Sequence, residues 1–156
     1  MKKVIAAFDG LKFSDSTKEY ATHLTQNNNM HLAGIFLNDI TYHSYKFSEV
    51  LDEHGAVMEK QKNLFDQRDK NTRKDAEISF EEYCQEVGLN YSIHHNRLIA
   101  IQELLHESIY SDLLVIDANE TFNRYEKEPP TYFIQDLLTD VHCPVLLVPK
   151  KYKPIE

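Results

Sequence analysis

A loop near the end of the chain has the position of a phosphate-binding loop but lacks its glycines. It spans residues 117–131 and lies between the apolar runs 113–116 and 145–148. Phosphate loops use glycines because backbone N–H groups must approach the phosphate closely, and the following helix start adds a favourable dipole. This loop contains no glycine, and Thr131 supplies the hydroxyl at its end. The sequence therefore predicts that the architecture is kept and the phosphate loop is lost.

The charges of this loop oppose a phosphate only in part. Its acidic residues are Asp117, Glu120, Glu126 and Glu128, and its basic residues are Arg124 and Lys127. Because the two signs partly cancel, the missing glycines count for more, as no side chain replaces close backbone access.

Polar residues also follow the other apolar runs. In an open parallel sheet, ligands bind beyond the carboxyl ends of the strands. The residues expected at that edge, and proposed as ligand-binding candidates, are Asp9, Gly10, Asn38, His95, Asp117, Asn119 and Thr131. The alternative is that strands simply end in polar, turn-forming residues.

The chain shows no set of residues with catalytic spacing. His94 and His95 are adjacent on a predicted strand, so they point to opposite faces and are poorly placed to share a metal. The serines, among them Ser14 and Ser111, lack a nucleophile-elbow context. We expect neither a metal site nor catalytic residues.

Strands and helices alternate along the whole chain. Apolar runs predict strands at 4–8, 31–37, 89–93, 113–116 and 145–148, and the polar alternation of 89–93 favours an edge position. Helical periodicity fills the intervals, including one long helix over about 56–87, and Ser16 with Glu19, or alternatively Ser14, marks the first helix start. This order predicts an α/β fold, a single domain over 1–156 with a parallel sheet and right-handed crossovers.

Composition excludes several classes of protein. The net charge is -8, which disfavours nucleic acid or an anionic membrane as a partner. No apolar run approaches 18 residues, and the first run stops at Asp9, so neither a transmembrane helix nor a signal peptide is expected. With Cys84 and Cys143 as its only cysteines, the chain is predicted to be a reduced, cytoplasmic protein.

Three segments, VIAAFDG, SDLLVIDA and DVHCPVLLVPK, resemble the universal stress protein family over essentially the whole chain. The resemblance implies five parallel strands in the doubly wound order 3-2-1-4-5 with helices on both faces. It implies, in many members, dimerisation through the last strand. Members that bind ATP carry Gly-x-x-Gly, then a further Gly with Ser or Thr, after the fourth strand. Here only Thr131 matches that pattern, while Asp9 matches the aspartate that contacts the nucleoside in the binding members.

Two functions from different classes remain open. The first is a non-enzymatic stress-response protein that acts as a dimer and binds another protein or a small ligand, with no cofactor. The second is an ATP-binding member with a remodelled loop and at most weak hydrolysis. A flavin-binding protein of similar topology would need a phosphate loop after the first strand, where GLKFSDS has one glycine.

Two further segments carry expectations of their own. The uncharged last strand, Val145, Leu146, Leu147 and Val148, is predicted to be a dimer interface, unless the tail 150–156 folds back over it. The aromatic group Tyr42, Tyr45 and Phe47 either covers the candidate pocket or anchors a long insertion to the core.

Overall fold

The computed structural model describes residues 2–38, 42–96, 99–125 and 127–154. The elements in chain order are β1 (Lys3–Asp9), α1 (Asp15–Asn28), β2 (His31–Leu37), η1 (Phe47–Val50), α2 (Glu59–Glu86), β3 (Tyr91–Asn96), α3 (Ala100–Ser108), β4 (Leu113–Asp117), α4 (Tyr132–Asp140) and β5 (Val145–Val148). The predicted strands are confirmed to within a few residues. The irregular stretch after β2 contains a short 3-10 helix, η1.

The five strands form one parallel sheet in the order β3-β2-β1-β4-β5. Ile5 of β1 is in register with Ala33 of β2 on one side and with Leu114 of β4 on the other. β3 and β5 are the two edge strands, which confirms the edge position predicted from the alternating third strand. The predicted doubly wound topology is correct.

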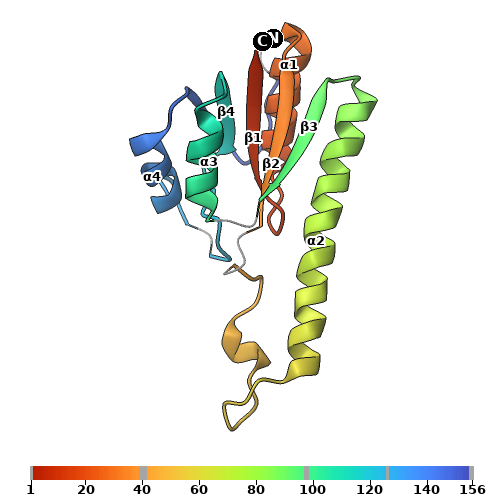
Figure 1. The fold of residues 1–156 in the computed structure, drawn as a ribbon, viewed down its shortest axis with the longest axis vertical. Coiled ribbons are helices and arrows are strands. Elements are labelled where there is room, and N and C mark those ends of the chain that lie inside the picture. Colours follow the sequence, from red (N-terminus) through yellow and green to blue (C-terminus); the bar gives the residue numbers. More distant parts are fainter. Residues whose placement is uncertain (1, 39–41, 97–98, 126, 155–156) are drawn as a thin grey trace.

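Alternate residues of the buried strands pack on opposite faces of the sheet. Ile5 and Ala7 of β1 belong to a core that includes residues of α3 and α4, whereas Val4, Ala6 and Phe8 belong to a second core with α1 and α2. Helices therefore cover both faces (Figure 1). Because β1 and β4 are parallel neighbours, the loops that follow them start at the same edge of the sheet.

Helix α1 begins at the serine named as its alternative cap. The Ser14 hydroxyl accepts a hydrogen bond from Thr17 N (3.2 Å), so Ser14 is the N-cap. Ser16, the first choice from the sequence, lies inside the helix and donates instead to the Pro149 carbonyl. The helix therefore begins two residues earlier than the capping-box pattern of Ser16 and Glu19 indicates.

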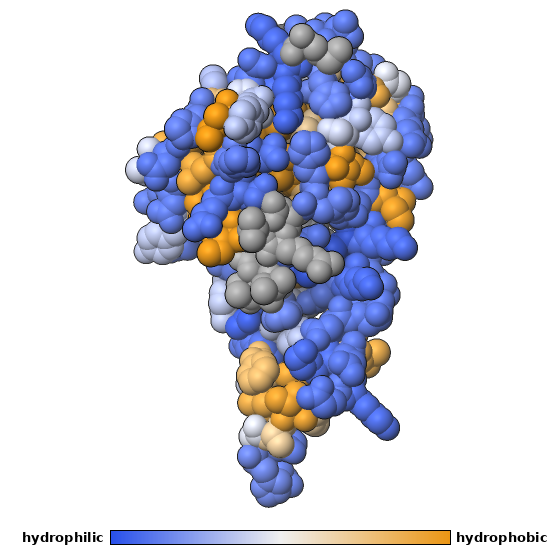
Figure 2. All heavy atoms as spheres, in the orientation of Figure 1, coloured by the Kyte–Doolittle hydropathy of each residue, from blue (hydrophilic) through white to orange (hydrophobic). Residues whose placement is uncertain are grey.

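Helix α2 extends well beyond the sheet. Its second half packs on the sheet through Ala76, Phe80 and Cys84, whereas its first half runs past the strand ends beside η1 (Figure 1). We call residues 42–66 the projecting arm. Four apolar side chains are exposed on it, Phe47, Val57, Met58 and Leu64. Figure 2 shows a hydrophobic area on this part of the molecule.

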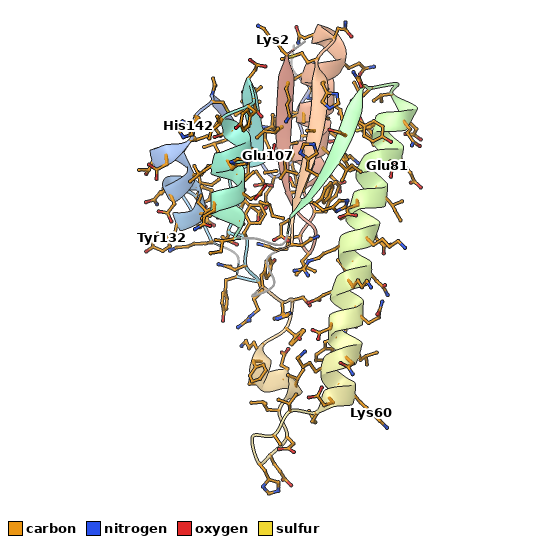
Figure 3. The ribbon with its side chains drawn as sticks, viewed as in Figure 1. Lys2, Lys60, Glu81, Glu107, Tyr132 and His142 are labelled. Carbon is orange, nitrogen blue, oxygen red and sulfur yellow. The ribbon has the colours of Figure 1, made fainter. Side chains whose placement is uncertain are left out.

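Figure 3 shows Lys60 at the far end of the arm and Glu81 next to β3, which marks the two halves of α2. Among the helices described, none is long and apolar enough to cross a membrane.

Candidate functional site

Asp9 ends β1 and lies at the centre of a buried polar cluster. The residue is only 1% exposed. Its Oδ1 accepts a hydrogen bond from Leu11 N (2.9 Å), and its Oδ2 accepts one from the Tyr42 hydroxyl (2.7 Å). Both carboxylate oxygens are therefore engaged by groups of the chain itself.

A single ammonium group lies between two buried carboxyl groups. Lys12 Nζ is 3.9 Å from Asp9 Oδ2 and 3.9 Å from Glu120 Oε1, and it donates a hydrogen bond to Thr121 Oγ1 (2.9 Å). Glu120 is 5% exposed, and its Oε1 accepts a hydrogen bond from Phe122 N (3.0 Å). The cluster therefore joins the loop after β1 to the loop after β4.

Burial shifts the protonation of both carboxyl groups. Desolvation first, and then the charge of Asp9, raise the pKa of Glu120 to about 8. Burial also raises the pKa of Asp9, although the hydrogen bonds from Tyr42 and Leu11 act in the opposite direction. Because two carboxylates share one lysine, the cluster holds Glu120 mainly in its protonated form at neutral pH.

Helix α2 positions Tyr42 over Asp9. Arg73 Nη2 donates to the Tyr42 carbonyl (2.9 Å), and Ser44 N donates to Asp69 Oδ2 (3.0 Å). The Tyr45 hydroxyl also donates to Asp66. Segment 42–45 is thus fixed to the helix by charged groups, and it holds the Tyr42 ring 6% exposed.

The end of β4 is tied to the start of α1. The Ser14 hydroxyl donates to Asp117 Oδ2 (2.9 Å), and Asn119 N donates to Asp117 Oδ1 (2.8 Å). Beside these groups lies a pocket of about 360 Å³, lined by Lys12, Phe13, Ser14, Asp15, Asp117, Asn119, Glu120, Lys127 and Lys150. Three lysines and three acidic residues line it, and one of the acidic residues, Glu120, is the group whose pKa burial raises.

The loop that would hold a phosphate is closed down on the core. Phe122 has φ 49°, is 7% exposed and packs against Phe133 with ring centroids 4.5 Å apart. Thr131, the remaining match to the ATP-binding pattern, is fully buried and caps α4 by accepting from Ile134 N. Its hydroxyl donates to the Glu120 carbonyl (2.7 Å), so it holds the loop together.

The structure brings some of the predicted residues together and separates others. Asp9, Asp117 and Asn119 lie around the loops after β1 and β4. Gly10 permits the close approach of α2, since a Cβ there would be 2.9 Å from Arg73 Cγ.

The other two candidates lie toward α2. His95 Nδ1 is 2.8 Å from Glu77 Oε1, and Asn38 lines a second pocket against the same helix. The expected single pocket is therefore divided. Asp117 and Asn119 line the first pocket and Asn38 lines the second, whereas Asp9, Gly10, Thr131 and His95 line neither of the two.

Sequence reasoning missed Lys12 and the central roles of Glu120 and Tyr42. The sequence pattern presents Glu120 only as a charge that opposes phosphate. Of the aromatic group, Tyr42 and Tyr45 are buried, whereas Phe47 is 60% exposed. Tyr42 holds its segment on α2 through its carbonyl and covers Asp9 with its side chain. Covering and anchoring, the two roles considered for the aromatic group, are thus combined in this residue.

Comparison with known proteins identifies the fold. No family model matches the sequence, and no curated protein matches it. Among solved structures, universal stress protein UspA from Lactobacillus plantarum aligns with a TM-score of 0.61 at 13% identity, over 94% of this chain and 97% of that one.

Two further structures agree with this match. A universal stress protein family protein from Arabidopsis thaliana, solved with AMP bound, aligns with a TM-score of 0.62 at 13% identity, over 97% of this chain and 93% of that one. The universal stress protein from Archaeoglobus fulgidus aligns with a TM-score of 0.59 at 10% identity, over 95% of this chain and 93% of that one. The chain is a doubly wound α/β protein. More particularly, it has the universal stress protein fold.

Proposed function

We propose that this chain is a universal-stress-type binding protein without catalytic activity, which acts as a dimer in the cytoplasm on a protein or small ligand. One observation carries the proposal. Both oxygens of Asp9, the residue that matches the nucleoside-contacting aspartate, accept hydrogen bonds from Leu11 N and from the Tyr42 hydroxyl. The chain's own tyrosine hydroxyl thus takes up a carboxylate oxygen of Asp9 that a nucleoside would need.

The phosphate side of the site supports the same proposal. The loop after β4 lacks glycine, and Glu120 and Phe122 fold it inward. A buried Glu120 that ionised beside a bound phosphate would add repulsion in a desolvated place. Nucleotide binding would thus require Tyr42 to leave and the loop to open.

A second candidate function is nucleotide binding through a remodelled site. The pocket of about 360 Å³ favours it, because Lys12, Lys127 and Lys150 line this pocket at the start of α1, where anions are stabilised. The Arabidopsis protein of the same fold was solved with AMP bound. We place this candidate second, since Asp15 and Asp117 offset two of the three lysines, and the loop beside the pocket lacks the glycines that bring backbone N–H groups to a phosphate.

Thermal unfolding with nucleotide separates the two candidates. We expect millimolar ATP or AMP with Mg²⁺ to leave the melting temperature unchanged. A ligand at 100 times its Kd would stabilise the fold by about 2.7 kcal/mol, which is easily detected. A saturable rise in melting temperature would favour the second candidate over the first.

The free edge of β5 supports the dimer. Leu147 is 39% exposed on this strand, and within the described ranges no further strand pairs beyond β5. The tail lies on α1, because Tyr152 packs against Tyr20 with centroids 4.8 Å apart and Lys153 N donates to the Tyr20 hydroxyl (3.2 Å). We therefore propose that a second copy pairs with this edge.

A further inference from the structure

A polar cluster lies on the side of β2 and β3 that faces α3. Ser92 is in register with Ala33 and His94 with Ile35, and both of these β2 residues belong to the core that includes α3. His31 begins β2 and points to the same face, because side chains alternate along a strand. We call this group the histidine cluster, and its residues are His31, Ser92, His94 and Glu107.

One hydroxyl group of the histidine cluster lies between two imidazole rings. Ser92 Oγ is 2.9 Å from His31 Nε2 and 3.4 Å from His94 Nε2. A hydroxyl has a single proton, so Ser92 can donate a hydrogen bond to only one of these two nitrogens. The rings therefore present their Nε2 atoms to the same place from two different strands.

The other ring nitrogen of His94 faces a carboxylate. His94 Nδ1 is 3.3 Å from Oε1 of Glu107, which projects from α3 (Figure 3), and Glu107 Oε2 is 3.5 Å from Lys3 Nζ. Because an ionised carboxylate only accepts hydrogen bonds, Nδ1 carries the proton and Nε2 keeps a lone pair directed at Ser92. Metal-ligating histidines are commonly oriented in this way, by a carboxylate on the nitrogen that does not bind the metal.

The histidine cluster lies at the protein surface. The His94 side chain is 37% exposed, and His31 is also partly exposed. Glu107, at 16%, is the more buried partner of His94. A ligand of the two rings can thus exchange with solvent while the carboxylate behind His94 stays in place.

This pair of histidines differs from the adjacent pair in the sequence. His95 points to the opposite face of the sheet, where its Nδ1 is 2.8 Å from Glu77 Oε1 of α2. His94 and His95 therefore do not share a ligand, and the fold supplies His31 as the second imidazole. Among the described residues no three His, Cys, Asp or Glu side chains form a metal-binding group, so the histidine cluster offers two nitrogen ligands and leaves the other coordination positions to water.

We propose that His31 and His94 bind one divalent transition-metal ion of the zinc or copper class through their Nε2 atoms. The ion accepts a lone pair from both nitrogens, which the single proton of Ser92 cannot do. Imidazole suits Zn²⁺, Cu²⁺ and Ni²⁺, whereas Mg²⁺ and Ca²⁺ prefer oxygen ligands. This site is separate from the Asp9 cluster, so the inference goes beyond the proposed function and does not depend on it.

Calorimetric titration of the unaltered protein with Zn²⁺ and with Cu²⁺ tests the proposal. We expect one ion per chain, with Cu²⁺ bound more tightly than Zn²⁺ and no binding of Mg²⁺ here. Glu107→Ala should weaken binding by about tenfold or more, since it frees the His94 ring. His31→Gln and His94→Gln should each weaken it further, because one imidazole remains. His95→Gln, on the opposite face, and Asp9→Asn are the controls and should leave the affinity unchanged.

Proton NMR of the unaltered protein locates the ion without any substitution. Substoichiometric Cu²⁺, which is paramagnetic, should broaden the ring signals of His31 and His94 before those of the other histidines. The proposal is wrong if neither ion binds, if both histidine variants bind as tightly as the unaltered protein, or if another histidine is broadened first. A loss in His95→Gln as large as that in His94→Gln would also overturn it. The histidine cluster would then be only a hydrogen-bonded link between β2, β3 and α3.

Discussion

The protonation of Glu120 links the residues around Asp9 to pH. Its pKa is raised to about 8 by burial and then by the charge of Asp9, while in the unfolded chain it titrates near its ordinary value of 4.5. Between these values the folded state binds more protons than the unfolded state. Stability contributed by this group is therefore complete below pH 4.5, falls as the pH rises toward 8, and stays low above it.

Replacing Glu120 by Gln removes the loss of stability that ionisation of this buried side chain causes. Glu120→Gln keeps the acceptor for Phe122 N and mimics the protonated side chain. We expect its melting temperature to exceed that of the unaltered protein at pH 9 by about 2–4 °C or more, corresponding to at least about 1 kcal/mol, and the gain to shrink toward pH 5. Glu128→Gln, on an exposed part of the same loop, is the matched control and should show no such trend. A gain that is independent of pH would contradict the assignment.

The hydroxyl of Tyr42 is the second residue-scale test. Tyr42→Phe removes one hydrogen bond and leaves Asp9 Oδ2 buried, with the Lys12 ammonium 3.9 Å away. We expect a loss of about 1–3 kcal/mol in the free energy of unfolding, measured in urea. The exposed Tyr110 supplies the control, since Tyr110→Phe should change stability by less than about 0.5 kcal/mol. Equal effects of the two substitutions would show that the Tyr42 hydroxyl is not engaged.

These residue contacts mark the limit of prediction from the sequence. Asp9 and Asp117 were predicted because strand ends of a parallel sheet meet at one edge. The hydrogen bond from Tyr42 to Asp9 spans 33 residues and depends on how α2 holds segment 42–45. No periodicity encodes such a contact, so Tyr42 was assigned only to a group with two alternative roles.

At the scale of elements, strands were predicted most accurately. The run 31–37 is confirmed residue for residue as β2, because continuous apolar runs bounded by polar residues leave little choice of boundary. The start of α2 was predicted three residues early, at 56 instead of Glu59, since its first turns lack an apolar face. The division of the candidate site into two cavities depends on this helix passing Gly10, which the sequence pattern does not specify.

Packing of α2 on the sheet depends on a glycine in β2. A Cβ at Gly34 would lie 2.7 Å from Phe80 Cε1, so Gly34→Ala forces the Phe80 ring out of its place in the core. We expect a loss of about 1–3 kcal/mol, measured by urea unfolding. The double variant Gly34→Ala with Phe80→Leu should lose less than the sum of the two single changes. Additive losses would show that the glycine and the ring do not contact one another.

At the scale of the whole molecule, we propose that the free edge of β5 forms the dimer interface. Leu147 is exposed, whereas Leu146 packs partly against the core with α1 and α2. Leu147→Asp therefore tests the interface with the least disturbance of the monomer. We expect the unaltered protein to sediment as a dimer at micromolar concentration and Leu147→Asp as a monomer with an unchanged circular dichroism spectrum. Leu138→Asp, on exposed α4, is the control and should remain dimeric.

A monomeric unaltered protein, or a Leu147→Asp variant that still dimerises, would exclude β5 as the interface. The projecting arm would then be the next surface to examine, because Phe47 and Leu64 are exposed on it.

Calorimetric titration of ATP with Mg²⁺ into the unaltered protein tests the central proposal most directly, namely that Tyr42 engages the Asp9 carboxylate and so leaves it unavailable to a nucleoside. The account predicts no saturable heat up to millimolar nucleotide, because binding would have to displace a buried hydrogen bond and open a loop without glycines. Saturable binding with a micromolar Kd would contradict the account, and it would show that the remodelled loop still holds a nucleotide.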